Sequence, residues 1–287
     1  MKFDKNTKIL IVGLGLIGGS YAKALSDEGY FVGAIDKKKS SVEYALKNGL
    51  IQVGETSVKK DFVKDFDLII FALYPHDFIN WIKEYQSSIK SGALITDVTG
   101  VKSFVVENVQ KILRGDLEFV GAHPMAGKEV SGVENADSKI FVGANYIVTP
   151  TKKNTDENVQ AVKDLGRALG FERISSLSPE EHDETVGFLS HLTHCIAVSL
   201  MVSKKSHHLA EYTGDSFRDL TRIAKINDEM WSELFLANKD ELLKQMDLFE
   251  EKFNQLKEDI KNDNREKIRE TLRESTARRK VFDKDAK

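Results

Sequence analysis

A glycine-rich turn near the start of the chain has the spacing of a dinucleotide-binding site. Gly13, Gly15 and Gly18 form a GxGxxG motif between a strand-like segment and a helical one. The first glycine permits a tight turn, the second lets the backbone approach a pyrophosphate, and the third lets the helix pack closely on the strand. Backbone N–H groups at the helix start would then bind the phosphates. A strand–turn–helix without a ligand is the alternative interpretation.

An acidic residue at the end of the next strand favours the dinucleotide interpretation. Asp36 lies 18 residues after Gly18, where a carboxylate accepts hydrogen bonds from the ribose hydroxyls of adenosine. Because a carboxylate repels a 2′-phosphate, NAD is the expected cofactor and NADP is less favoured, although the three lysines at 37–39 could bind that phosphate. Other cofactor contacts are expected at Leu16, Ile17, Ala72, Leu73, Pro75 and Thr99.

Two polar segments follow later strands, at the edge of the sheet where an α/β protein binds its ligands. One is Asp97–Lys102. The other contains His123, which ends a predicted strand over Phe119–His123 and precedes Pro124, a residue that stops strand pairing and turns the chain. A histidine there is either a packed, hydrogen-bonded residue or an acid–base group, and its location favours the catalytic interpretation.

The remaining histidines include a pair on a helix. His191 and His194 are three residues apart and therefore share a helical face with Ser190. No HExxH motif or cysteine cluster supplies further ligands, so we expect no metal. His182 is interpreted as solvated and His207-His208 as surface residues. His76 is expected either near the cofactor or only at a helix start.

Two arginines four residues apart, Arg218 and Arg222, can present guanidinium groups on one helical face, and arginine binds carboxylates bidentately. Ordinary pairing with Asp215 or Asp219 is the alternative. Together, a nicotinamide cofactor, a histidine at a strand end and an arginine face suggest oxidation of an anionic alcohol.

Alternating strands and helices must position these groups in the first part of the chain. The predicted strands are mostly continuous apolar runs, which is typical of parallel strands buried on both faces. They are Ile9–Gly13, Phe31–Asp36, Leu68–Leu73, Leu94–Val98, Phe119–His123, Tyr146–Val148 and Phe171–Ile174. Helices are predicted between them over Gly18–Glu28, Ser41–Asn48, His76–Tyr85, Ser103–Leu113 and Asp156–Leu169. This alternation indicates a doubly wound, mostly parallel α/β domain.

Beyond the last predicted strand only helical patterns occur. Ser178 can cap a helix that starts at Pro179, with Glu181 completing a capping box. We therefore predict two domains, 1–175 and 176–287, the second all-helical. A later apolar series is spaced 4-3-4-3-4, which indicates the seam between two helices packed lengthwise, in one chain or between subunits. Its members are Leu242, Met246, Phe249, Phe253, Leu256 and Ile260.

Composition excludes several classes of protein. The chain has 287 residues, of which 41% are hydrophobic, so it can form substantial cores. Its 42 basic and 45 acidic side chains leave a formal charge of -3, which argues against general binding to nucleic acids or anionic membranes. The single cysteine, Cys195, excludes an internal disulfide. We see no signal sequence and no apolar run approaching the ~20 residues of a membrane span. A cytoplasmic protein is therefore expected.

The ordered motifs together resemble the prephenate/arogenate dehydrogenase family of tyrosine biosynthesis. The motifs that carry the resemblance are Gly13–Ser20, Asp97–Lys102, Gly121–Gly127 with Glu129, Ser190–His194, and Phe217–Ala224 with Met230-Trp231. The resemblance implies a Rossmann domain followed by an all-helical domain that forms a homodimer. It also implies NAD-dependent oxidative decarboxylation of prephenate to 4-hydroxyphenylpyruvate and carbon dioxide.

The resemblance also implies roles for individual residues. His123 would hydrogen-bond the 4-hydroxyl group of the substrate and accept its proton as hydride leaves, which requires a neutral imidazole. Arg222 would bind a substrate carboxylate, and Trp231 would reach the pocket within its own subunit or across the dimer. Glu129 and Asp219 would join Arg218 in an ionic gate. The other residues implied at the substrate are Ser190, His191, His194, Thr99, Gly100 and Arg218.

The chain departs from the family pattern at Gly100, where a serine is frequent. The role of that serine, contact with cofactor and substrate hydroxyl, is then lost or passes to Thr99. Thr193 also replaces a frequent proline. From the chain length we expect neither a regulatory ACT domain nor a chorismate mutase domain. Arogenate dehydrogenase and a non-catalytic NAD-binding sensor are the alternative functions.

Overall fold

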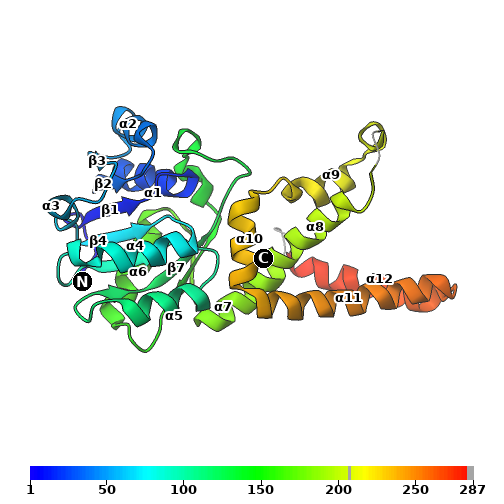
Figure 1. The fold of residues 1–287 in the computed structure, drawn as a ribbon. Coiled ribbons are helices and arrows are strands. Elements are labelled where there is room, and N and C mark those ends of the chain that lie inside the picture. Colours follow the sequence, from blue (N-terminus) through cyan, green and yellow to red (C-terminus); the bar gives the residue numbers. More distant parts are fainter. Residues whose placement is uncertain (206–207, 283–287) are drawn as a thin grey trace. The chain divides into compact units, whose positions relative to one another are not determined.

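The computed structural model of the chain describes residues 1–205 and 208–282 (Figure 1). Contacts divide the chain into two compact units, Met1–Lys239 and a second unit that begins at Asp240. His207, expected at the surface, lies outside the described residues.

A parallel sheet of six strands forms the centre of the first unit, in the order β3-β2-β1-β4-β5-β6. The chain adds strands in one direction from β1 and then continues on the other side with β4, so the carboxyl ends of these two strands flank the crevice in which doubly wound sheets bind ligands. The predicted fold class is confirmed. The strands are β1 Lys8–Val12, β2 Phe31–Ile35, β3 Val53–Glu55, β4 Leu68–Phe71, β5 Leu94–Asp97 and β6 Glu118–Phe119.

Helices cover both faces of this sheet. Ile9 and Ile11 of β1 enter one core with the helices of the first face, whereas Leu10 and Val12 enter the other core. Burial on both faces explains why the strands are almost continuously apolar. The helices are α1 Leu16–Asp27, α2 Lys39–Lys47, α3 Lys60–Val63, α4 Pro75–Tyr85 and α5 Ser103–Ile112, with a 3₁₀ turn η1 at Gln86–Ser88. The sequence did not predict β3 and α3, which are short.

A second sheet of three strands, in the order β7-β8-β9, follows the first. The prediction of one strand over Phe119–His123 is wrong, because the chain leaves the parallel sheet after β6 and then pairs antiparallel with β8. Pro124 does not end that pairing, since β7 is an edge strand with a neighbour on one side only. The elements are β7 Gly121–Met125, η2 Val133–Asn135, η3 Ser138–Phe141, β8 Asn145–Thr149, α6 Asp156–Ala168 and β9 Arg173–Ser176.

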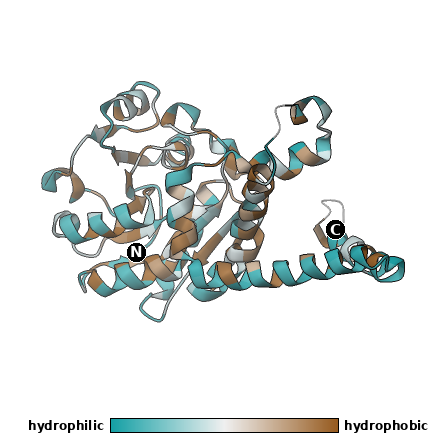
Figure 2. Ribbon diagram, turned by 45° about the vertical axis from the view of Figure 1, so that its right-hand side comes forward, coloured by the Kyte–Doolittle hydropathy of each residue, from teal (hydrophilic) through white to brown (hydrophobic). Residues whose placement is uncertain are grey.

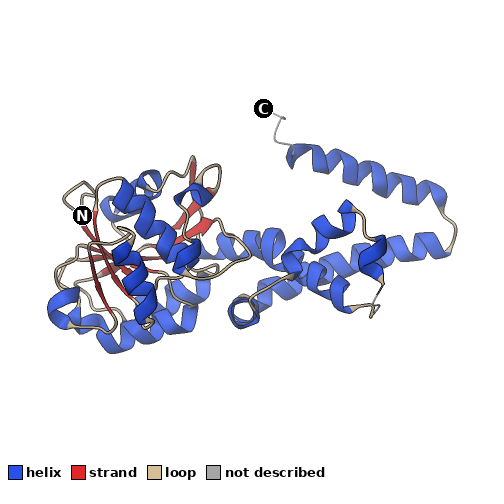
Figure 3. Ribbon diagram, turned by 90° about the horizontal axis from the view of Figure 1, so that it is seen from above, coloured by secondary structure: helices blue, strands red, loops and turns tan. Residues whose placement is uncertain are grey.

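Only helices and turns follow β9 among the described residues (Figure 3), as the sequence predicts. The first of these helices starts at the predicted capping box, in which Ser178 and Glu181 each accept a hydrogen bond from the backbone N–H of the other. The elements are α7 Pro179–Val186, a π-helical segment η4 Gly187–Leu192, α8 Thr193–Val202, η5 Leu209–Tyr212, α9 Asp215–Thr221, η6 Arg222–Ala224, α10 Asp228–Ala237, α11 Lys239–Lys261, α12 Arg265–Arg279 and η7 Lys280–Phe282.

One helix, Pro179–Val202, is long and apolar enough by length and composition to cross a membrane, contrary to the expectation from apolar runs. The expectation failed because uncharged polar residues interrupt the run without lowering its mean hydropathy enough. This helix also carries His182, Asp183 and His191, which are buried inside the fold. A core helix of a soluble protein has the same length and composition.

The predicted heptad series lies on α11, whose ribbon is mostly hydrophilic with hydrophobic residues at intervals (Figure 2). Four of its members, Met246, Phe249, Phe253 and Ile260, have exposed fractions between 39% and 59%. The second unit therefore does not bury these four side chains itself, and they form an apolar surface on α11.

Candidate active site

The glycine motif forms the turn between β1 and α1, beside the carboxyl end of β4. Gly13 has a φ of +100°, and a Cβ there would lie 2.4 Å from the carbonyl oxygen of Ala72. A Cβ at Gly18 would lie 1.9 Å from the carbonyl oxygen of Gly13, so both positions require glycine. Gly15, at the N-terminus of α1, has no atom within 4 Å of its would-be Cβ. The turn is thus tightly packed below and open above, which suits a bound pyrophosphate.

Asp36 follows β2 and faces this turn. Its Oδ2 accepts a hydrogen bond from the backbone N–H of Leu14 at 2.6 Å, and its Oδ1 accepts one from Lys38 at 2.7 Å. These bonds hold the carboxylate at the carboxyl edge of the sheet, where a ribose would lie. The side chains of the three following lysines are exposed. Leu16 and Ile17 start α1, while Ala72, Leu73 and Pro75 follow β4, so the structure brings together the residues predicted to hold a dinucleotide.

A buried ion pair lies under the turn that follows β5. The Nζ of Lys102 is 2.6 Å from Oδ2 of Asp97, and both side chains are fully buried. The hydroxyl of Thr99 contacts the same carboxylate oxygen, and it accepts a hydrogen bond from Lys102 at 2.8 Å. The hydroxyl of Thr99, which could take over the role of the serine that Gly100 lacks, is thus hydrogen-bonded within this inner network.

His123 lies within β7, and its two ring nitrogens have different surroundings. Nδ1 is 2.8 Å from Nε2 of His182. Nε2 has no hydrogen-bond partner among the described residues and lies 3.8 Å from the would-be Cβ of Gly100. Burial is the largest cause that holds the pKa of His123 well below its usual range, and the nearby charge of Lys102 lowers it further. The imidazole is therefore neutral at neutral pH, as a proton acceptor must be.

The expectation that His182 is solvated is wrong. Its side chain is fully buried, and its Nδ1 is 2.7 Å from Oδ1 of Asp183. A signal for this burial existed, since Pro179, His182, Asp183 and Val186 have the i, i+3, i+4, i+7 spacing of one helical face. Val186 marks that face as the apolar one.

Ser190 and His191 lie in the π-helical segment η4, a feature that is frequent at functional sites, and His194 follows in the first turn of α8. The ring of His194 stacks on Trp231 of the same chain with centroids 3.7 Å apart, and the ring of His191 lies 6.0 Å from Trp231. His191 is buried, and its Nδ1 is 3.2 Å from the amide nitrogen of Asn238. The structure thus places both predicted histidines against one tryptophan.

The two arginines have separate partners. Arg222 forms an ion pair with Glu129, and the two side chains expose 63% and 39% of their surface. Arg218 pairs with Asp215 at 3.4 Å, and Asp219 is exposed. The structure therefore shows the Glu129 contact at Arg222 and not at Arg218, where the ionic gate was expected. Arg218 lies within α9, whereas Arg222 directly follows this helix and begins the 3₁₀ turn η6.

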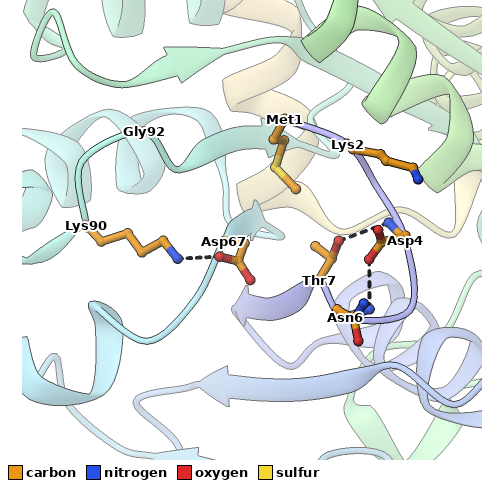
Figure 4. A pocket seen from close by; sticks show the side chains of 8 residues that line it. All are labelled: Met1, Lys2, Asp4, Asn6, Thr7, Asp67, Lys90 and Gly92. Carbon is orange, nitrogen blue, oxygen red and sulfur yellow. Dashed lines mark hydrogen bonds and ion pairs between the residues drawn. The ribbon is translucent and has the colours of Figure 1, made fainter.

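A hollow of about 220 Å³ lies at the opposite, amino-terminal edge of the parallel sheet (Figure 4). Asp67 and Lys90 line it and form an ion pair with each other. Doubly wound sheets bind their ligands at the carboxyl edge, so this hollow is not a candidate active site.

Acidification should destabilise the fold through its buried histidines. Burial is the first cause that lowers the pKa values of His123 and His182, and it lowers that of His191 to about 4. As the pH falls below the ordinary histidine pKa, the unfolded chain binds protons that the folded chain does not. His191 alone should then remove on the order of 2 kcal/mol from the free energy of unfolding between pH 7 and pH 5.

Urea denaturation at these two pH values measures this loss. His191→Gln should reduce the pH dependence, whereas His208→Gln, a change at an exposed histidine, should leave it unaltered. A free energy of unfolding that is the same at both pH values would contradict the burial of neutral histidines.

Two family models match the chain. The model of the prephenate dehydrogenase nucleotide-binding domain matches residues 21–173, and the model of the prephenate dehydrogenase dimerization domain matches residues 178–274. Prephenate dehydrogenase of Bacillus subtilis is 35% identical over 249 residues, which are 83% of this chain and 66% of that protein. The chain therefore spans about two thirds of the length of this relative.

Solved structures agree with these matches. Prephenate dehydrogenase from Aquifex aeolicus, in complex with hydroxyphenyl propionate and NAD+, is 34% identical with a TM-score of 0.88, covering 96% of this chain and 98% of that one. Arogenate dehydrogenase from Synechocystis is 25% identical with a TM-score of 0.82, covering 96% of this chain and 100% of that one.

Proposed function

Since this chain belongs to the prephenate dehydrogenase family of oxidoreductases, we propose that it converts prephenate and NAD to 4-hydroxyphenylpyruvate, carbon dioxide and NADH. The observation that best supports this reaction is the neutral, half-buried His123, whose free Nε2 lies next to Gly100 at the carboxyl edge of the sheet. A proton acceptor is the group that oxidation of a secondary alcohol requires.

The proposed reaction assigns a proton-handling role to His123. NAD, held by the glycine turn and Asp36, would supply the acceptor for the hydride of the ring carbon that carries the hydroxyl. Nε2 of His123 takes the hydroxyl proton as the carbonyl forms. The bond from the ring to its carboxylate then breaks, carbon dioxide leaves, and the electrons of that bond make the ring aromatic. His123 returns its proton to the phenolate oxygen, so the residue is unchanged after one turnover.

The proposed substrate contacts follow from the site. The guanidinium of Arg222 binds a substrate carboxylate, which takes the place of Glu129 on this arginine. The stacked rings of His194 and Trp231 form a wall of the pocket together with Ser190 and His191. Glu129 competes for Arg222 when no substrate is present and so acts as the ionic gate.

We propose a homodimer that forms through the helical domain, with domains at 1–175 and 176–287. The open stripe on α11 and the exposed Phe188, Leu189, Met201 and Val202 supply apolar surface for this interface. The match to a dimerization domain over residues 178–274 supports the assignment. We also propose a cytoplasmic location, since the reaction consumes and releases small soluble molecules.

One assay separates the candidate functions. NADH or NADPH absorbance is followed with prephenate and with arogenate, each with NAD and with NADP. The proposal predicts that prephenate with NAD gives the highest kcat/KM. Faster turnover of arogenate would make the protein an arogenate dehydrogenase, as in the Synechocystis relative. No turnover in any pairing would favour a non-catalytic NAD-binding sensor.

The cofactor preference depends on Asp36. A 2′-phosphate beside this carboxylate would suffer repulsion of several kcal/mol, so we expect kcat/KM for NAD to exceed that for NADP by about 100-fold or more. Asp36→Asn keeps the shape of the side chain but removes its negative charge. It should therefore bring kcat/KM for NADP closer to that for NAD. Equal kcat/KM for NAD and NADP in the unmodified enzyme would contradict the proposal that Asp36 selects NAD.

Gly100→Ser should raise kcat/KM for prephenate. A Cβ at this position would lie 3.5 Å from both Cδ atoms of Leu234 and 3.8 Å from Nε2 of His123, which are ordinary contact distances. The added hydroxyl could hydrogen-bond both His123 and the substrate hydroxyl, and one such bond is worth about a 3- to 10-fold gain in kcat/KM. Gly100→Ala is the matched control for the added carbon, and a serine variant no better than the alanine variant would refute the gain.

A further inference from the structure

A buried chain of hydrogen bonds connects the start of α5 to His123 through α7. The carboxylate of Asp183 accepts hydrogen bonds from the backbone N–H groups of Lys102 and Ser103, each at 2.8 Å. Its Oδ1 is also 2.7 Å from Nδ1 of His182, and Nε2 of His182 is 2.8 Å from Nδ1 of His123. Asp183 and His182 are almost completely buried, so no solvent competes for these bonds.

The direction of every bond in this chain follows from its first member. Backbone N–H groups can only donate, so Asp183 must be an acceptor toward Lys102 and Ser103. A carboxylate so held accepts from Nδ1 of His182 as well. Neutral histidine carries one N–H, so Nε2 of His182 is left as an acceptor. Nδ1 of His123 must then donate to it, and Nε2 of His123 keeps its lone pair.

We propose that Asp183 and His182 are positioning residues that hold His123 in the tautomer whose unprotonated Nε2 faces the substrate hydroxyl. This inference rests on the proposed function, in which that nitrogen accepts the hydroxyl proton. Once His123 has taken the proton it is a cation, and His182 backed by the Asp183 carboxylate stabilises it without itself changing protonation. The arrangement follows the logic by which a buried aspartate orients a catalytic histidine.

A purely structural role makes a different prediction from a positioning role. If His182 only fills space, an apolar side chain of similar size should retain kcat once the fold is intact. If it orients His123, kcat should depend on an acceptor at its Nε2 position. Glutamine supplies one, because its amide oxygen reaches about as far as the histidine Nε2, whereas leucine does not.

The kinetic test compares these variants in the full-length enzyme. His182→Leu should lower kcat for prephenate by about 10- to 100-fold with little change in KM, and His182→Gln should recover most of that loss. Asp183→Asn keeps an amide oxygen at the Oδ1 position, where it still accepts hydrogen bonds from Lys102 and from Nδ1 of His182, but it removes the negative charge behind the two histidines, so its kcat should fall by about 10-fold. His208→Leu, at an exposed histidine, is the matched control, and the thermal melting of each variant reports whether it folds.

The tautomer is measured directly, without turnover, by nitrogen NMR of enzyme labelled in its seven histidines. The His123→Asn variant identifies the resonances of His123. The proposal predicts an unprotonated Nε2 and a protonated Nδ1 at this residue, and a larger share of protonated Nε2 in His182→Leu, which lacks the acceptor for Nδ1 of His123. A protonated Nε2 of His123 in the unmodified enzyme, or a wild-type kcat in His182→Leu, would overturn the positioning role of His182 and Asp183 even if the enzyme turns over prephenate. An enzyme that turns over no prephenate would refute the proposed function. The tautomer of His123 would still test whether His182 and Asp183 position its ring.

Discussion

Replacing His123 by asparagine should lower kcat for prephenate by about 10²- to 10⁴-fold, the usual contribution of a positioned general base. Asparagine offers hydrogen bonds but cannot take a proton at neutral pH. Because cofactor and substrate carboxylates are bound by other residues, we expect KM to change much less than kcat. The rate of NADH formation at saturating prephenate measures the effect.

The fold should survive this substitution. His123 lies on the edge strand β7 and is only half-buried, so an asparagine fits without a large cavity. His208→Asn, at an exposed position, is the matched control and should retain full activity. A His123→Asn enzyme with near-normal kcat would show that the proton acceptor is another group.

Replacing Arg222 by alanine should raise KM for prephenate by about 10- to 100-fold, which is the effect of losing a charge-assisted hydrogen bond of 1.5 to 3 kcal/mol. In the proposed mechanism the guanidinium binds a carboxylate remote from the reacting carbon, so kcat should fall less than kcat/KM. The substitution also frees Glu129, whose charge would then repel the anionic substrate. Initial rates over a range of prephenate concentrations separate KM from kcat.

Substitutions of two other arginines serve as controls for this result. Arg167 is exposed and pairs with Asp164 on α6, so Arg167→Ala should leave KM unchanged. Arg218 pairs with Asp215 on its own helix, and Arg218→Ala should therefore have a smaller effect than Arg222→Ala. A KM unaltered by Arg222→Ala would remove this residue from the carboxylate site.

The repeating strands and helices could be predicted from sequence because each depends on a local pattern. Continuous apolar runs marked β1, β2, β4 and β5, and the capping box marked the start of α7. The sequence could not show that the chain changes sheets at Val120, since residues 118–125 remain a plausible strand throughout. Only the pairing partner changes there, from β5 to β8, and pairing is not a local property.

The parts of the candidate site that could be predicted are those in which a residue is recognised by its type and its place in a local motif. The positions of Gly13, Gly15 and Gly18 in a strand-to-helix turn and of His123 on a strand belong to this class, while their roles in binding and catalysis stay predictions. His182 and Asp183 were missed because buried polar groups depend on partners far away in sequence, here Lys102, Ser103 and His123. The partner of Arg222 was missed for a similar reason, since Glu129 is 93 residues distant.

Quantifying all products from prephenate and NAD tests the central claim most directly. The proposed mechanism couples hydride loss to loss of the ring carboxylate, so it predicts equal amounts of NADH, carbon dioxide and 4-hydroxyphenylpyruvate from each prephenate consumed. The His123→Asn enzyme should form all three products more slowly in the same proportion. An unmodified enzyme that forms no NADH with prephenate, or NADH without carbon dioxide, would contradict the account.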